Sequence, residues 1–238
     1  MVVGPLRWLA AMTVVYTFLR HLLKISQLGG AIVRRTLASV LVAIVVCAAV
    51  PASAQGAAGA GKLELTIVPG GWLSFTQGEE RPEPGFGQYL AGGTFTVNWS
   101  MVGIEAELFA APGRPQNLDF GTRSVNQGSP MVVLDSVNLV VPLAGNSRTA
   151  VPYVTGGLGE VTIMRTSDNV LQPDTETLTA GSFGGGVKWY TEGRWGFRGD
   201  YRFTAVRSKF DAPGSFFGRE FRKSHRIYGA LVVKLISR

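Results

Sequence analysis

Cysteine and histidine are almost absent from this chain of 238 residues. Cys47 is the only cysteine, and His21 and His225 are the only histidines. If the chain is cut after Ala54, as argued below, the mature protein has no cysteine, which excludes a disulfide framework and a thiol site. Charged side chains are also scarce, at 16% against roughly 25% in an ordinary soluble domain. Glycine (31 residues) and phenylalanine (13 residues) are abundant, and this bias toward turns and aromatic surfaces argues against a helical protein.

Acidic residues are missing from the first 54 positions, which hold five basic ones. The other 18 basic residues face 16 acidic ones, so the formal net charge of +7 belongs mainly to this leader. The remaining excess is too small to indicate a nucleic-acid-binding surface. We therefore expect no nucleic-acid partner.

The leader has the layout of a secretory signal peptide. Arg34 and Arg35 precede the apolar run LASVLVAIVVCAAV, which ends in the small residues of PASA. This pattern predicts a signal peptide over residues 33–54, with cleavage between Ala54 and Gln55. The apolar run is shorter than the roughly 20 residues that a membrane-spanning helix needs.

Two segments flank the predicted signal peptide. Residues 1–32 contain a second apolar stretch that no ordinary signal requires, and we interpret them as an extra segment created by a mis-assigned translation start, with the true start near Val33. Residues 55–62, QGAAGAGK, are predicted to form a flexible linker.

Beyond the linker, apolar residues alternate with polar or small ones, which is the period-two pattern of β-strands. The pattern predicts eight strands, at residues 63–76, 89–99, 101–111, 132–143, 151–163, 179–191, 194–206 and 226–236. In the seventh, for example, Phe197, Tyr201 and Phe203 share one face, while Arg198 and Asp200 share the other. The strand lengths fit the roughly 9 to 11 residues of a tilted membrane strand.

Long and short connections alternate strictly between these strands. The long polar ones are residues 77–88, 112–129, 165–177 and 207–224, and the short ones lie near Ser100, at residues 144–150 and at Glu192 and Gly193. This sorting is typical of an up-and-down barrel whose two ends face different compartments. The predicted fold class is all-β: a closed, eight-stranded, antiparallel, up-and-down transmembrane barrel over residues 63–238, preceded by a signal peptide.

The charges on the predicted strands support an inside-out arrangement. In a membrane barrel the aromatic face contacts lipid, and the charged face fills the narrow lumen. Because a desolvated charge is costly unless it is paired, we expect a ladder of internal salt bridges. Its predicted members are Glu64, Glu105, Glu107, Lys188, Arg198, Asp200, Arg202 and Lys234. Four aromatic residues near the short turns, Trp99, Trp189, Tyr190 and Trp195, are predicted to form an interfacial girdle.

The segments NLVVPLAG, VPYVTGGLGE, FGGGVKWY and WGFRGDYRF resemble the eight-stranded outer-membrane β-barrel family, the OmpA/OmpX-like barrels of Gram-negative bacteria. The resemblance covers most of residues 63–236. It implies a location in the cell outer membrane and insertion by the outer-membrane assembly machinery. That machinery reads a carboxy-terminal strand that usually ends in an aromatic residue, whereas this chain ends in KLISR with Arg238 last.

The predicted function is a structural or surface-interaction role, without catalysis, cofactor or metal, for a monomeric barrel with a plugged polar lumen. The connection before the last strand mixes cations with phenylalanines and is a candidate contact for lipopolysaccharide or another surface. Its residues are Lys209, Phe210, Phe216, Phe217, Arg219, Arg222, Lys223 and Arg226.

Three alternative functions remain open at the level of sequence. The barrel could be a small porin-like pore, or a soluble periplasmic barrel that binds a ligand. It could also be an enzyme that modifies lipid A, for which Ser224, His225 and Glu220 are the nearest approach to a catalytic triad. Neighbouring residues of a strand point to opposite faces, however, so Ser224 and His225 are poorly placed to pair.

Overall fold

The computed structural model describes residues 60–76, 85–99, 101–119, 124–144, 149–164, 175–207 and 221–236. The predicted signal peptide with its cleavage site, the segment 1–32 and the loop residues Lys209, Phe210, Phe216, Phe217 and Arg219 lie outside these ranges. No helix capable of spanning a membrane is found among the described residues.

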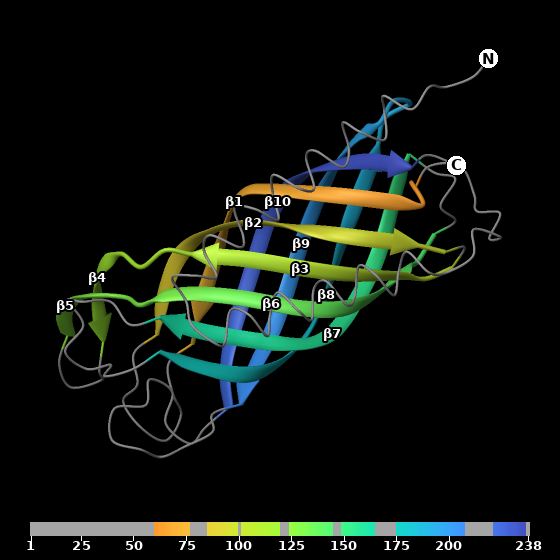
Figure 1. Ribbon diagram of the computed structural model, residues 1–238. Helices are drawn as coiled ribbons and strands as arrows, with labels where there is room; N and C mark the ends of the chain where they lie inside the picture. The colour runs from red at the N-terminus through yellow and green to blue at the C-terminus, as the bar shows by residue number, and fades with distance from the viewer. Residues whose placement is uncertain are drawn as a thin grey trace. The chain divides into compact units, whose positions relative to one another are not determined.

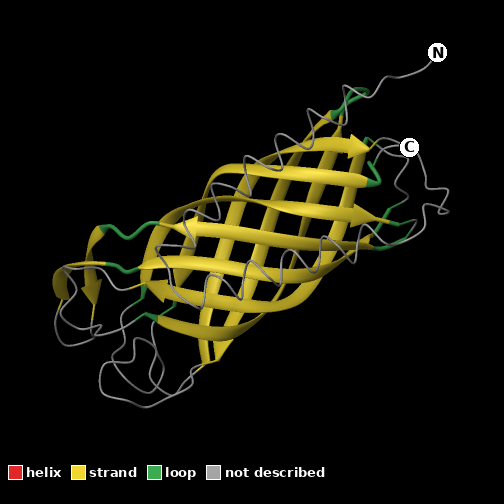
Figure 2. Ribbon diagram, viewed as in Figure 1, coloured by secondary structure: helices red, strands yellow, loops and turns green. Residues whose placement is uncertain are grey.

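Eight long antiparallel strands close into a barrel (Figures 1 and 2). They are β1 (Leu63–Phe75), β2 (Phe86–Asn98), β3 (Gly103–Ala111), β6 (Met131–Pro142), β7 (Ala150–Met164), β8 (Glu176–Tyr190), β9 (Trp195–Arg207) and β10 (Phe221–Ile236). Each strand pairs with its neighbours along the chain, and β1 pairs with β10 to close the sheet. The predicted all-β fold class, a closed antiparallel up-and-down barrel, and the predicted count of eight barrel strands are confirmed; the signal peptide that was predicted to precede the barrel stays a prediction.

The two ends of the barrel differ. At the short-turn end, brief connections join β2 to β3, β6 to β7 and β8 to β9; at the opposite, long-loop end lie the four longer connections. Three strands extend farther toward the long-loop end than the alternation predicted: β2 begins at Phe86, β8 at Glu176 and β10 at Phe221. The connection between β3 and β6 also forms a small hairpin that was not predicted, β4 (Pro115–Asp119) paired with β5 (Ser124–Gly128).

Side chains alternate between the lumen and the outer wall, with a change of phase at the irregularity of β1 between Ile67 and Gly70. Along β9 the even-numbered residues from Gly196 to Val206 are buried or nearly so, and Phe197 and Tyr201 on the outer wall are 54% and 46% exposed. On β7, Val151 and Tyr153 point inward, and Val154 points outward.

Glycines in β8 allow bulky partners to occupy the lumen. A Cβ atom on Gly186 would lie 2.6 Å from the Tyr153 hydroxyl and 2.1 Å from the Gly199 carbonyl oxygen. A Cβ atom on Gly184 would lie 2.1 Å from the Tyr201 carbonyl oxygen. The run Gly184-Gly185-Gly186 therefore serves close packing against β7 and β9.

Candidate functional site

The centre of the lumen holds a four-membered charge cluster contributed by β3 and β9. Arg202 Nη2 lies 2.6 Å from Glu105 Oε1, and Arg198 Nη2 lies 2.6 Å from Asp200 Oδ2. Arg198 also contacts Glu105 through Nη1 and, at 3.1 Å, through Nη2. All four side chains are fully buried. Burial removes both carboxylates from water, and the neighbouring guanidinium groups offset this desolvation cost.

Uncharged groups complete the coordination of this cluster. Thr94 and Thr96, on β2, donate hydrogen bonds to Glu105 Oε2 at 3.1 and 3.0 Å. The Tyr153 hydroxyl, on β7, donates to Asp200 Oδ2 and accepts from Arg198 Nε at 2.7 Å. Thr94, Thr96 and Tyr153 were not among the lumen residues predicted from the sequence. The alternation on β2 does place Thr94 and Thr96 on the inward face, but no spacing rule identified Tyr153.

The network continues toward the long-loop end through Glu107. Its carboxylate lies 3.0 Å from Arg202 Nη1 and 2.6 Å from Arg226 Nη2, and it accepts a hydrogen bond of 2.7 Å from Ser136. Asn138 then donates to Ser136 at 2.8 Å. The Ser182 hydroxyl, on β8, donates to Asn138 Oδ1 at 3.2 Å. With the central cluster included, charged and polar side chains therefore tie together seven strands across the lumen: β2, β3, β6, β7, β8, β9 and β10.

A second cluster lies at the short-turn end around Glu64. Its carboxylate accepts hydrogen bonds from Lys188 Nζ at 2.7 Å, from the Tyr190 hydroxyl at 2.8 Å and from the Gly61 backbone N–H at 3.0 Å. Ala60 packs in an apolar cluster with Val151, Tyr190 and Val232. The last residues of the predicted linker, 60–62, thus belong to the barrel: the Lys62 N–H donates to the Ile236 carbonyl at 2.9 Å.

Apolar side chains fill the lumen near the long-loop end. They include Leu73, Phe75, Phe86, Leu90, Phe109, Val132, Leu134, Val161, Ile163, Leu178 and Val206. The prediction of a polar lumen therefore holds for only part of the barrel. The charge clusters occupy its centre and its short-turn end, whereas near the long-loop end a hydrophobic core lies beside the buried polar side chains of Gln88, Arg222 and Ser224.

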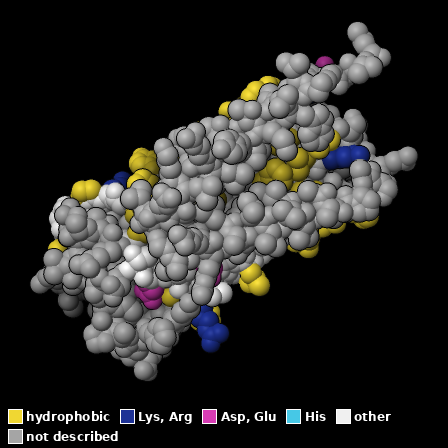
Figure 3. Space-filling view, in the orientation of Figure 1, with side chains coloured by type: hydrophobic (Ala, Val, Ile, Leu, Met, Phe, Trp, Pro, Cys, Tyr) yellow, Lys and Arg dark blue, Asp and Glu magenta, His cyan; other side chains and the backbone are white. Residues whose placement is uncertain are grey.

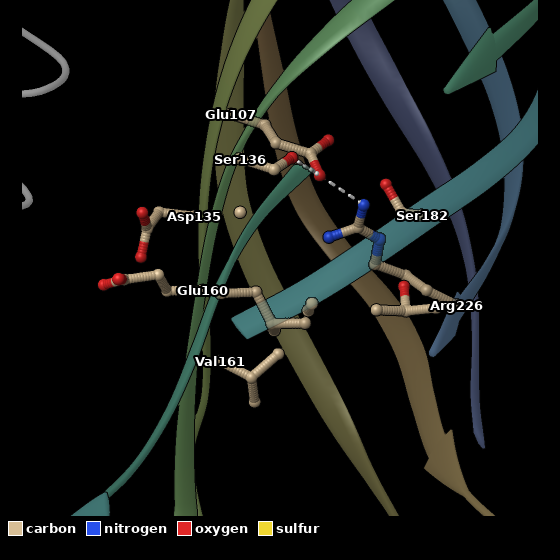
Figure 4. A pocket seen from close by; sticks show the side chains of 11 residues that line it. Glu107, Asp135, Ser136, Glu160, Val161, Ser182 and Arg226 are labelled. Carbon is tan, nitrogen blue, oxygen red and sulfur yellow. Dashed lines mark hydrogen bonds and ion pairs between the residues drawn. The ribbon is translucent and has the colours of Figure 1, made fainter. Parts of the chain in front are cut away.

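A small cavity borders the charge network. Its volume is about 10 Å³, and Glu107, Ser136, Ser182 and Arg226 line it (Figure 4). That is the space of about one water molecule, far below the roughly 300 Å³ of a small-molecule pocket. Asp135 and Glu160 project on the other side of the β6–β7 wall from Arg226 (Figure 4).

Several predicted site residues lie elsewhere than expected. Arg222 and Arg226 were assigned to an external contact loop, but they are 1% and 2% exposed and point into the lumen, because β10 begins at Phe221 and its even-numbered residues face inward. Lys223 does lie on the outer wall. Tyr190 was assigned to the interfacial girdle, but it is 5% exposed and hydrogen-bonded to Glu64 in the lumen, again because even-numbered positions of β8 point inward.

The remaining predicted residues are placed as follows. Lys234 lies in the lumen at the short-turn end, where Nζ donates to the Thr191 carbonyl at 3.3 Å and lies 5.5 Å from the centre of the Tyr190 ring. Ser224 is fully buried, whereas His225 contacts the Tyr201 hydroxyl on the outer wall, so the two side chains of the suggested triad occupy opposite faces. No group of three or more potential metal ligands occurs among the described residues.

No protein-family model matches the chain. No curated protein matches it either. Solved structures do match. The match to neisserial surface protein A covers 74% of this chain and 99% of the neisserial chain, with a TM-score of 0.51 and 9% sequence identity. Two further matches have lower TM-scores. The N-terminal β-barrel domain of Pseudomonas aeruginosa OprF matches with a TM-score of 0.45 and 16% identity, over 73% of this chain and 99% of that one. Ail of Yersinia pestis matches with a TM-score of 0.45 and 10% identity, over 73% of this chain and 97% of that one.

The match to the neisserial protein establishes the class of fold. The chain has the eight-stranded β-barrel fold seen in that surface protein, and the predicted resemblance to OmpA/OmpX-like barrels is confirmed at this level.

Proposed function

We propose that the protein is an integral outer-membrane β-barrel with a closed lumen that acts through its outer wall and its long-loop end. The observation that carries this proposal is the inversion of burial. Arg198, Arg202 and Glu105 are buried, while large apolar side chains are exposed on the outer wall, among them Leu158 at 73%, Phe183 at 64% and Ile227 at 58%.

Lipid as the surrounding solvent explains this inversion. A monomeric soluble protein rarely exposes a contiguous apolar surface larger than a few hundred Å², yet large apolar side chains are exposed on every strand of the barrel except β3. Hydrophobic side chains are also visible in several of the coloured areas of the face drawn in Figure 3. The closed sheet also satisfies the backbone hydrogen bonds that hydrocarbon would leave unmet. Trp189 and Trp195, 46% and 55% exposed at the short-turn end, suit an interfacial girdle.

The side chains inside the barrel favour an interaction or structural role over a conduit. The charge clusters, the hydrophobic core above them and residues 60–62 at the short-turn end leave little room for solvent. Outer-membrane insertion implies the assembly machinery and lipopolysaccharide as partners, and a monomer suffices because the barrel has no open sheet edge.

Membrane fractionation with a heat-modifiability gel tests the proposal. We expect the protein in the outer-membrane fraction, with unboiled and boiled samples migrating at different positions because a closed barrel resists unfolding by detergent alone. Recovery in the soluble periplasmic fraction, with a single gel position, would contradict it.

A small pore is the second candidate, and planar-bilayer recordings separate the two. We expect no steady conductance from the folded protein, since Glu105, Glu107, Arg198, Arg202 and Arg226 are paired across the lumen. As a control, a porin reconstituted in the same way should give stepwise openings. Ohmic steps from this protein at its own folded gel position would establish a conducting lumen.

A further inference from the structure

The outer wall along β9 and β10 changes character from the long-loop end to the short-turn end. Residues that face each other across the two strands form a ladder of outward pairs. From the long-loop end these pairs are Arg207/Phe221, Ala205/Lys223, Phe203/His225, Tyr201/Ile227, Gly199/Gly229, Phe197/Leu231 and Trp195/Val233. Two cations come first, then a hydrogen-bonding aromatic layer, and then only apolar or small residues.

The cationic layer is compact. Arg207 and Lys223 are both exposed and occupy diagonal positions of adjacent pairs, which places their Cα atoms roughly 7–8 Å apart. Below them the Tyr201 hydroxyl and His225 Nδ1 form a hydrogen bond of 2.7 Å, and the Phe203 ring packs edge-on against His225 at 5.5 Å. Cations above amphipathic rings match the depth at which the phosphates of a lipid headgroup lie.

Directly below this layer, side chains are missing from one level of β10 and β1, which leaves a shallow groove. Its floor is made by Gly229 and Gly70, which face each other in register and have nothing within 4 Å of the position of a Cβ atom. On β9 the groove ends at Gly199, where the Trp189 ring lies 3.6 Å from that position. One wall is made by Tyr201, Ile227 and Trp72, and the other by Phe197, Leu231 and Ile67. Rows of side chains on one face of a sheet are roughly 7 Å apart, so one missing row leaves a channel suited to a single hydrocarbon chain.

We propose that this wall of β1, β10 and β9 binds one molecule of lipopolysaccharide, with lipid A phosphate oxygens against Arg207 and Lys223 and an acyl chain in the glycine groove. The inference rests on the proposed location in the outer membrane and names a partner of that same outer wall. Charge and shape support it independently, since the cations would select phosphate and the groove would select a chain.

The opposite side of the barrel makes this wall selective. Asp135 on β6 and Glu160 on β7 face each other in register on the outer surface, nearer the long-loop end. Two carboxylates there repel phosphate groups by like charge. An anionic lipid is therefore directed to the β9–β10 wall rather than distributed evenly around the barrel.

Binding of purified lipid A to the full-length folded barrel, in phosphatidylcholine nanodiscs and followed by native mass spectrometry, tests the proposal. The double variant Arg207→Gln/Lys223→Gln should bind roughly tenfold or more weakly, because each cation near a charged lipid surface contributes separately. Arg194→Gln, an exposed cation at the short-turn end, is the matched control and should bind like the unaltered protein.

Groove filling is tested by Gly229→Leu. Nothing lies within 4 Å of the position of a Cβ atom there, so the barrel should fold normally and retain its heat-modifiable gel shift. Lipid A binding should fall several-fold, whereas Gly156→Leu, on the outer face of β7 away from both the groove and the cations, should have no effect. Dephosphorylated lipid A should bind weakly to every variant.

Equal binding of lipid A by all folded variants, or equal binding of the phosphorylated and dephosphorylated forms, would overturn the proposal. Either result would leave the outer-membrane location intact. A protein that fails to enter nanodiscs at all would instead refute the proposed function, on which the lipid site depends.

Discussion

Replacing Glu105 with alanine should lower the free energy of unfolding by about 3–5 kcal/mol, the usual cost of removing one partner from a buried ion pair. Glu105 lies between Arg198 and Arg202 and accepts hydrogen bonds from Thr94 and Thr96. Its removal leaves two buried guanidinium groups short of negative charge in a lumen too tightly packed to rehydrate them.

Urea titration of the barrel refolded in lipid vesicles, read from the folded and unfolded gel bands, measures this loss. Glu192→Ala, an exposed carboxylate in a short turn, is the control and should stay within about 0.5 kcal/mol of the unaltered protein. A change at Glu105 as small as that at Glu192 would mean that water reaches the cluster, and the lumen would then not be closed.

A double-mutant cycle sharpens the result. Glu105→Ala/Arg198→Ala should lose less stability than the sum of the two single variants, because removing Arg198 also removes a charge that the loss of Glu105 leaves uncompensated. Strictly additive effects would show that the contacts between Glu105 and Arg198 contribute nothing to stability.

The sequence was sufficient to predict the closed barrel because the period-two signal is strong where the two faces have opposite polarity. On β9, for example, Arg198, Asp200 and Arg202 alternate with aromatic or small residues. Their even-numbered positions alone therefore predict that these three side chains point into the lumen. The same argument located Glu105 and Glu107 on β3 and Lys188 on β8.

Parity fails where both faces are apolar or where a loop resembles a strand. Val132, Val133 and Leu134 give no contrast, so the hydrophobic core near the long-loop end was invisible in the sequence although Val132 and Leu134 are buried. Arg222 and Arg226 stand in or beside a basic, aromatic connection, and only the start of β10 at Phe221 assigns them to the lumen. Pairing partners across the barrel depend on strand register and shear, which no local pattern encodes.

Placing arginine at position 139 should distinguish lipid from water as the solvent of the outer wall. Leu139 is 51% exposed on β6 and lies midway along the outward row from Asp135, near the long-loop end, to Leu143, at the short-turn end. In a bilayer Leu139→Arg should cost about 2–4 kcal/mol, the penalty for a cation near the midplane on the lipid face. Its side chain would have no water and no lumen partner within reach.

Leu143→Arg supplies the matched control, since Leu143 is 63% exposed and lies four residues nearer the membrane surface. There the penalty should fall to about 0–1 kcal/mol because the side chain reaches the headgroups.

The difference in unfolding free energy between Leu139→Arg and Leu143→Arg, measured in the same lipid vesicles, is therefore the most direct test of the inside-out barrel. A penalty at position 139 larger by about 2 kcal/mol or more agrees with an outer wall solvated by hydrocarbon. Equal and negligible penalties at both positions would mean that the exposed apolar wall faces water, and would contradict the membrane assignment.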